Sequence, residues 1–152
     1  MSVSASIGIS LFRETNTNIP GSIILPVLID SGWRISSNGT VGYLPAETND
    51  VAEWQYACIN FDSLLNIFKI KEIKKEITGV RLFWQDTQVA CNFTFFPDDI
   101  MKTLSININQ DRQLVTFASG YEMTNFQWYL EKLLPPLDKA FEVEFVSCKH
   151  HR

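Results

Sequence analysis

The sequence predicts an α+β domain in which two main helices pack on a mostly antiparallel, curved sheet of about six to eight strands. Segments with strand-like alternation of apolar and polar residues outnumber helical segments along the chain. Short turns join consecutive strand segments, which favours antiparallel pairing. Helix start and stop signals occur twice, in residues 62–79 and 124–137. Without any linker-like stretch, residues 1–152 are predicted to form a single globular domain.

The N-terminal segment predicts a strand with one buried face. Apolar residues take alternate positions from Val3 to Leu11, with serine and glycine between them. The segment has neither a basic region nor a continuous apolar block, so we do not expect a signal peptide. A Pro-Gly turn at residues 20–21 then leads into an apolar run interrupted by Pro26. The proline predicts an edge strand or a bulge there.

The middle of the chain contains the first predicted helix, DSLLNIFKIKEIKKEITG, residues 62–79. Asp62 or Ser63 is a suitable N-cap, and Gly79 is a typical stop signal. Its apolar residues lie on two different sides of the helix. The helix is therefore either covered on two sides near its start or broken near Lys69.

The C-terminal half predicts four strands, a helix and a last strand. A hairpin turns at Asp86 and Thr87, and further strands cover TLSININ and QLVTFAS. The helix in TNFQWYLEKLLPPL, residues 124–137, has apolar residues with core-facing spacing and is expected to end at the double proline. In the last strand, AFEVEFVSC, three apolar side chains share a face: Phe141, Val143 and Phe145.

Residue types suited to catalysis are scarce. The only histidines are His150 and His151, and no nucleophile motif or phosphate-binding glycine loop occurs. Three widely spaced cysteines without a CxxC pair argue against a disulfide framework or a structural zinc site. We therefore expect no enzyme, no cofactor and no metal. An unrecognised pair of catalytic carboxylates is left as the third possibility.

Charge is unevenly distributed. Residues up to Asp62 contain six acidic and two basic side chains, a net charge of −4, and the remaining eleven acids and eleven bases cancel. An acidic surface repels phosphate, so a basic protein is a better expected partner than nucleic acid. No apolar run approaches the ~18 residues that a membrane span needs, and we expect a cytoplasmic chain.

Five residues are candidates for contact with a protein partner. Trp128 lies opposite the apolar face of its helix, where it either anchors a contact or packs under a neighbouring segment. The segment PAETNDVAEWQ, residues 45–55, places three acids near a second tryptophan, which suits recognition of a basic surface. The candidate partner-binding residues are Glu47, Asp50, Glu53, Trp54 and Trp128.

Residues 80–137 resemble immunity proteins of bacterial contact-dependent growth inhibition systems. The resemblance lies in the order of LSININ, the polar turn QDR, QLVTFAS and the aromatic helix TNFQWYLEKLLPPL. It implies a monomer that binds a cognate toxin domain, of a basic nuclease type, and neutralises it by occluding its active site. It implies no catalytic residues.

The alternative function is a small-ligand-binding domain with an apolar pocket enclosed by the sheet under the helices. Four aromatic residues could line such a pocket: Trp84, Phe93, Phe95 and Phe141. A cavity of several hundred Å³ would favour this function. A filled core beneath an exposed acidic and aromatic surface would favour the inhibitor.

Overall fold

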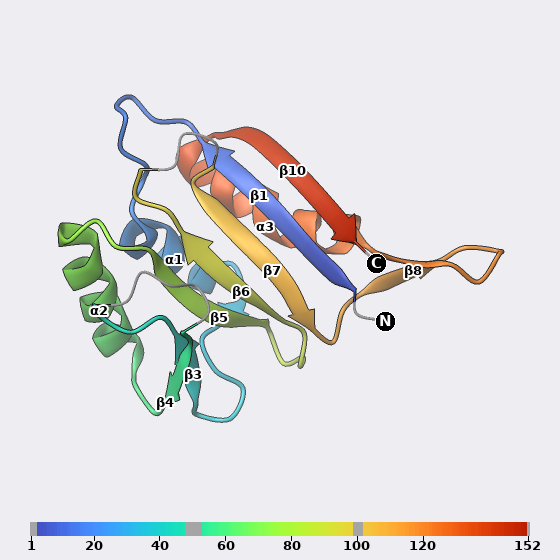
Figure 1. Cartoon of the computed structure of the whole chain (residues 1–152), viewed down its shortest axis with the longest axis horizontal. Helices are drawn as coiled ribbons and strands as arrows, with labels where there is room; N and C mark the ends of the chain where they lie inside the picture. The colour runs from blue at the N-terminus through green and yellow to red at the C-terminus, as the bar shows by residue number, and fades with distance from the viewer. Residues whose placement is uncertain (1–2, 48–52, 99–101, 152) are drawn as a thin grey trace.

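The computed structural model describes residues 3–47, 53–98 and 102–151, and Figure 1 shows how their helices and strands are arranged. The elements are β1 (Ser4–Leu11), α1 (Gly21–Asp30), β2 (Trp33–Arg34), β3 (Val41–Tyr43), β4 (Gln55–Ala57), α2 (Phe61–Ile73), β5 (Thr78–Trp84), β6 (Ala90–Phe95), β7 (Leu104–Gln110), β8 (Leu114–Thr116), β9 (Glu122–Thr124), α3 (Phe126–Phe141) and β10 (Val143–His151). The predicted α+β class is confirmed, with three helices in this part of the chain.

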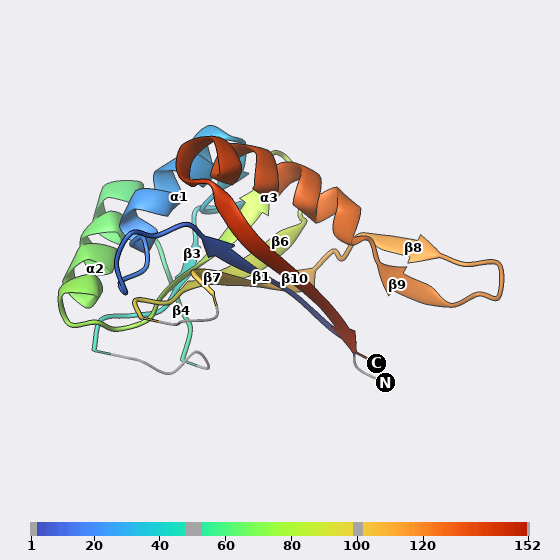
Figure 2. The same ribbon diagram turned by 90° about the horizontal axis from the view of Figure 1, so that it is seen from above.

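One antiparallel sheet forms the centre of the fold, in the order β10-β1-β7-β6-β5-β3-β4, with β2 paired to β5. β1 lies between β7 and β10. Because β1 and β10 are antiparallel, with Ser4 opposite His151, the start of β1 and the end of β10 lie at the same end of the sheet (Figure 1). β8 and β9 form a separate two-stranded sheet. This hairpin projects from the body of the protein at that same end (Figure 1, Figure 2).

The core lies between one face of the sheet and the helices. All three helices cover this face, whereas the opposite face, here called the open face, carries no described helix (Figure 2). Alternate strand residues such as Ile7 and Phe93 point to the helices and are 0% exposed, as is Phe68 of α2. Burying each such side chain contributes about 1.5–3 kcal/mol relative to leaving it exposed.

Residues 21–30 form the helix α1, so the prediction of a strand there was wrong. Its buried residues have the i, i+3, i+4, i+7 spacing of a helix: Gly21, Ile24, Leu25 and Leu28. Pro26 removes one backbone donor from the helix, yet the helix continues through it. The first turn is held from another element, because the Ser22 N–H donates to Oε2 of Glu72 at 2.9 Å and its hydroxyl donates to Oε1 at 2.6 Å. This bond across the fold was not predictable from the local sequence.

The double proline lies inside α3, so the predicted end of this helix was also wrong. α3 continues to Phe141, and its buried residues, Tyr129, Leu133 and Leu137, are all 0% exposed. Leu137, which directly follows the prolines, extends the buried row by one turn beyond Leu133. Burial of this row therefore outweighs the loss of two helical hydrogen bonds at Pro135 and Pro136.

α2 is shorter than predicted. It begins after Asn60, whose Oδ1 accepts from the Ser63 N–H at 2.8 Å, and it ends at Ile73. Gly79 lies within β5 and does not stop the helix. Because Leu64 and Phe68 are buried while Ile70 and Ile73 are 48% and 83% exposed, only one side of α2 packs on the core.

A register shift divides the apolar residues of β10. Val143 pairs with Leu11 on the helix-covered side, and Phe145 pairs with Ser10 on the open face. Glu144 is the extra residue between them, which is the geometry of a β-bulge. Phe145 is consequently 57% exposed, so the predicted common face for residues 141, 143 and 145 was wrong.

Candidate functional site

The projecting hairpin of β8 and β9, residues 114–124, is called the hairpin arm. Leu114, Val115 and Phe117 are 44%, 40% and 49% exposed, and they lie within four residues of one another. Single exposed apolar side chains are ordinary, but a group of them on a projecting element indicates a contact surface. The hairpin arm is therefore the candidate functional site.

The base of the arm is fixed to the body by backbone hydrogen bonds. The Gln113 N–H donates to the Tyr129 hydroxyl oxygen at 2.9 Å, and the Asn125 N–H donates to the Gln113 carbonyl at 2.8 Å. Burial raises the pKa of Tyr129 to about 12, because the charged phenolate would be desolvated. The helix α3, through Tyr129 and its N-cap Asn125, therefore sets the direction in which the arm leaves the body.

The tip of the arm is ordered by its own contacts. The Phe117 N–H donates to the Tyr121 carbonyl at 2.8 Å, and the Gly120 N–H donates to the Phe117 carbonyl at 2.9 Å. Gly120 has φ +87°, a backbone conformation that glycine adopts readily. The rings of Phe117 and Tyr121 stack with their centroids 5.9 Å apart. A partner would therefore meet a preorganised tip and would not have to order it.

His150 of β10 supplies a further anchor. Its Nδ1 accepts from the Thr124 N–H at 3.2 Å, so the neutral imidazole carries its proton on Nε2. Nε2 is buried without a hydrogen-bond partner in the described part of the chain, and so is Nε of Arg112. Both side chains line a hollow of about 350 Å³ between the arm and the sheet, together with Val3, Leu114, Gly120 and Glu122.

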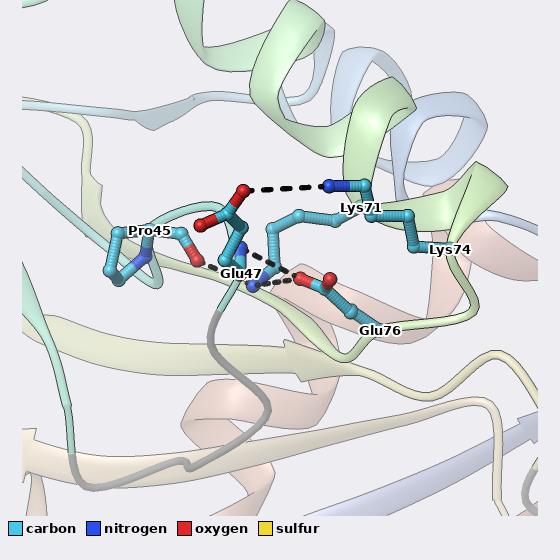
Figure 3. Close-up of polar contacts among 5 residues, drawn as sticks. All are labelled: Pro45, Glu47, Lys71, Lys74 and Glu76. Atoms are coloured by element: carbon cyan, nitrogen blue, oxygen red, sulfur yellow. Dashed lines mark hydrogen bonds and ion pairs between the residues drawn. The ribbon is translucent and has the colours of Figure 1, made fainter.

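The described start of the predicted acidic segment, with Pro45 and Glu47, is held against the end of α2 (Figure 3). The side chain of Lys71 is 0% exposed, and its Nζ donates to the Pro45 carbonyl at 2.6 Å and lies 3.3 Å from Oε1 of Glu76. The same carboxylate accepts from the Glu47 N–H at 3.0 Å. The Glu47 carboxylate itself lies 3.8 Å from Nζ of Lys74, so its charge is partly offset (Figure 3).

Burial lowers the pKa of Lys71, although the hydrogen bond to Glu76 and the charge of that carboxylate act in the opposite direction. Because the net shift is downward, desolvation of the ammonium group has the largest influence on the pKa of Lys71. The contact is structural, because a side chain with 0% exposure does not meet a partner. Sequence reasoning did not find it, since a lysine in a Lys- and Glu-rich helix end is normally solvated.

The other predicted contact residues of the acidic segment differ in accessibility. Glu53 is exposed, whereas Trp54 is half-buried. Cη2 of Trp54 lies 3.0 Å from the position that a Cβ on Gly79 would occupy, which places the indole over the open face. Asp50 lies outside the described residues. Glu47 thus lies beside the C-terminal end of α2, whereas Trp54 lies over β5 on the open face of the sheet.

Trp128 lies on the helix-covered side and is not brought together with Trp54. It is half-buried, with its ring edge-on to Tyr129 at 4.9 Å between centroids. Nζ of Lys132 lies 3.9 Å from the Trp128 centroid and 5.4 Å from that of Trp84. A lysine on the next turn therefore covers the tryptophan on the polar side of the helix by a cation–π contact.

The four aromatic residues named for an apolar pocket pack against other side chains. Trp84 and Phe93 both contact Trp33, with centroids 5.3 Å apart in each case, and Phe95 packs edge-on against a ring of α2. Phe141 is half-buried at the end of α3. These rings contribute to the hydrophobic core.

Sequence reasoning assigned the arm to the main sheet. QLVTFAS has the composition of a strand, but Leu114 and Val115 are both exposed because β8 pairs only with the short β9 within the described chain. The Ser119-Gly120 pair that follows is a hairpin signal and could have predicted the turn. The sequence has no signal for the outward direction of the arm.

Among the described residues, no group of three or more His, Cys, Asp or Glu side chains is placed to hold a metal ion. None of the helices that they form is long and apolar enough to cross a bilayer. Comparison with protein-family models, with curated proteins and with solved structures finds no match to this chain.

Proposed function

We propose that this chain is an immunity-type inhibitor that binds a cognate bacterial toxin domain, and that the hairpin arm is its principal contact. The observation that supports the proposal is the projection of three exposed apolar side chains on a hairpin whose base and tip are both ordered. Aromatic side chains in such positions contribute much of the binding energy at protein interfaces. The resemblance of residues 80–137 to immunity proteins gives the class of the partner.

Two exposed acidic side chains lie on or beside the hairpin arm. The exposed side chains of Asp111 and Glu122 lie at the start and within the hairpin, whereas Arg112 donates to the carbonyl oxygens of Val3 and Ile108. The chain as a whole carries a net charge of −4. Acidic groups around an apolar centre would steer a basic domain into contact and would fix its orientation.

The shape of the arm supports inhibition by occlusion. An element that leaves the body and ends in an aromatic tip can enter a cleft, while the body covers the rim (Figure 2). Because the tip is held by its own hydrogen bonds, little conformational entropy is lost on binding. The acidic segment with Glu47, Asp50, Glu53 and Trp54 would form a second, separate contact in this proposal.

The test is co-expression with the C-terminal domain of whichever large exported protein is found to be encoded immediately upstream of this chain. Wild-type protein should protect the cells and co-purify with the toxin domain. Phe117→Ser should weaken the complex by roughly 30-fold or more, since aromatic hot spots contribute about 2 kcal/mol or more.

Phe12→Ser is the matched control, because Phe12 is also a phenylalanine and is 44% exposed. It follows the last residue of β1, at the end of the sheet away from the hairpin arm. Phe12→Ser should bind as the wild type does. The absence of any complex with the wild-type chain would refute the inhibitor proposal. A complex that Phe117→Ser and Val115→Ser both leave unchanged would refute the role of the arm.

A further inference from the structure

We propose that the open face of the sheet carries a binding site for a small polar molecule with an oxyanion, a carboxylate or a phosphate group, and that Arg81 binds this group. This inference is independent of the inhibitor proposal, because it concerns β3 to β7 and not the hairpin arm. It depends on the charge of the open face, the fixed position of Arg81 and a hollow beside it.

The open face lacks acidic side chains at its described strand positions. The pairing of the strands places one row of side chains across it, from β10 to β5: Lys149, Ser6, Asn107, Asn92 and Arg81. A cation stands at each end of the row, with hydroxyl and amide groups between. Two cations and no carboxylate at these five described positions favour an anion over a cation as the ligand of this row.

Arg81 is held in place without a carboxylate. Its Nε donates to Oδ1 of Asn92 at 3.0 Å, and its guanidinium carbon lies 5.3 Å from the centroid of the exposed Tyr56 ring. It forms no ion pair with any residue in the described ranges. The edge formed by its two Nη nitrogens thus remains for a bidentate bond to an oxyanion.

A glycine makes room for this arrangement. A Cβ added to Gly42 would lie 2.7 Å from Cε1 of Tyr56 and 3.3 Å from Cβ of Arg81. Tyr56 can therefore take its position beside the guanidinium only because residue 42 has no side chain. The stacked Tyr56 ring limits the positions of Arg81 and so reduces the entropy that a ligand must offset.

The hollow beside Arg81 has a volume of about 210 Å³. Arg81 is its only charged lining residue, and uncharged polar side chains form most of the rest: Ser37, Asn38, Thr40, Gln88 and Gln110. The Thr40 N–H donates to Oδ1 of Asn38 at 3.1 Å, and Nε2 of Gln110 donates to the Gln88 carbonyl at 2.9 Å, so the rim is ordered. One arginine among amides and hydroxyls matches an anionic ligand with a hydroxylated body.

The test uses three probes with a common pyranose body: glucose 6-phosphate, glucuronate and uncharged glucose. Each is titrated into the 15N-labelled full chain, and amide chemical shifts are followed by NMR. At least one of the two anions should shift the resonances of residues around 38–42, 81 and 92 in a saturable manner, and glucose should not. The stronger of the two identifies the phosphate or the carboxylate as the preferred group.

Arg81→Gln should weaken this binding by about tenfold or more, because it removes a charged hydrogen-bond donor pair. Arg81→Lys retains the charge but loses the planar fork and should also bind more weakly. Lys149→Gln, at the other end of the row, should leave binding unchanged, and all variants should keep wild-type spectra outside the open face.

Three results would overturn the proposal. The first is that neither anion shifts these resonances, and the second is that glucose shifts them equally. The third is that Lys149→Gln weakens binding as much as Arg81→Gln, which would indicate only a diffuse attraction to the surface. None of these results bears on the toxin complex, so the two proposals fail separately.

Discussion

The ion pair of Lys71 and Glu76 allows a quantitative prediction. Glu76→Gln removes the carboxylate that lies 3.3 Å from the ammonium group of Lys71, whose side chain is 0% exposed. Removing one partner of a buried pair costs about 3–5 kcal/mol, and we expect the lower end, about 3 kcal/mol. The reason is that the Glu76 side chain is 15% exposed and the Pro45 carbonyl still accepts from Nζ. For a chain of this size the melting temperature should fall by roughly 6–12 °C.

A double-mutant cycle separates the pair from its surroundings. Lys71→Met should cost about 1–3 kcal/mol, because the Pro45 carbonyl loses its donor while the apolar stem is retained. The double variant Lys71→Met/Glu76→Gln should be more stable than the sum of the two single changes predicts, by at least about 1 kcal/mol. Urea unfolding measures all four free energies. Additive effects would contradict the assignment of a coupled, desolvated pair.

The same pair predicts a pH dependence. Burial lowers the pKa of Lys71 below its ordinary value of 10.5. Between the lowered folded-state pKa and 10.5 the unfolded chain binds more protons than the folded chain at this residue, so its contribution to stability rises with pH. The difference in unfolding free energy between wild type and Lys71→Met should therefore rise in this window. A flat or falling difference would show that Lys71 is not desolvated in the folded protein.

Three further predictions concern other parts of the molecule. Charge reversal by Glu47→Lys and Glu53→Lys should slow association with the toxin domain and flatten its salt dependence in stopped-flow experiments; unchanged kinetics would remove this segment from the interface. Pro135→Ala should stabilise the protein by about 1 kcal/mol in thermal unfolding, because it restores a helical hydrogen bond, and destabilisation would mean that α3 needs its proline geometry. Burial raises the pKa of Cys91 to about 12, so this thiol should resist alkylation in the native state while the two exposed cysteines react, as mass spectrometry of the peptides can establish.

The sequence predicted the features of the fold that depend on local periodicity. The alternation in β1 and the hairpin turn at Asp86 and Thr87 are both confirmed. Pro26 was misleading, because a short apolar run does not distinguish a buried strand from a buried helix, and α1 is held by Glu72 of another element. The double proline of α3 was misleading for a related reason, since burial of Leu137 outweighs the loss of the helical hydrogen bonds that the prolines cannot donate.

The candidate sites depended still more on distant contacts. Lys132 covers Trp128 on its polar side, and Lys71 anchors the acidic segment, yet both read as ordinary surface lysines in the sequence. Arg81 gained its significance only when strand pairing placed it beside Asn92, with no ion pair to a carboxylate among the described residues. Residue types can be read from a sequence, but the neighbours that define a site are set by the fold.

The position of β1 has a consequence for how the protein folds. β1 precedes both of its neighbours along the chain, β7 (Leu104–Gln110) and β10 (Val143–His151), by a long stretch of sequence. The two edges of β1 therefore stay unpaired until those later segments have been made. Such non-local pairing slows folding and exposes strand edges to aggregation. We expect refolding to be rate-limited by the docking of β1, after the β5–β6–β7 meander has already formed.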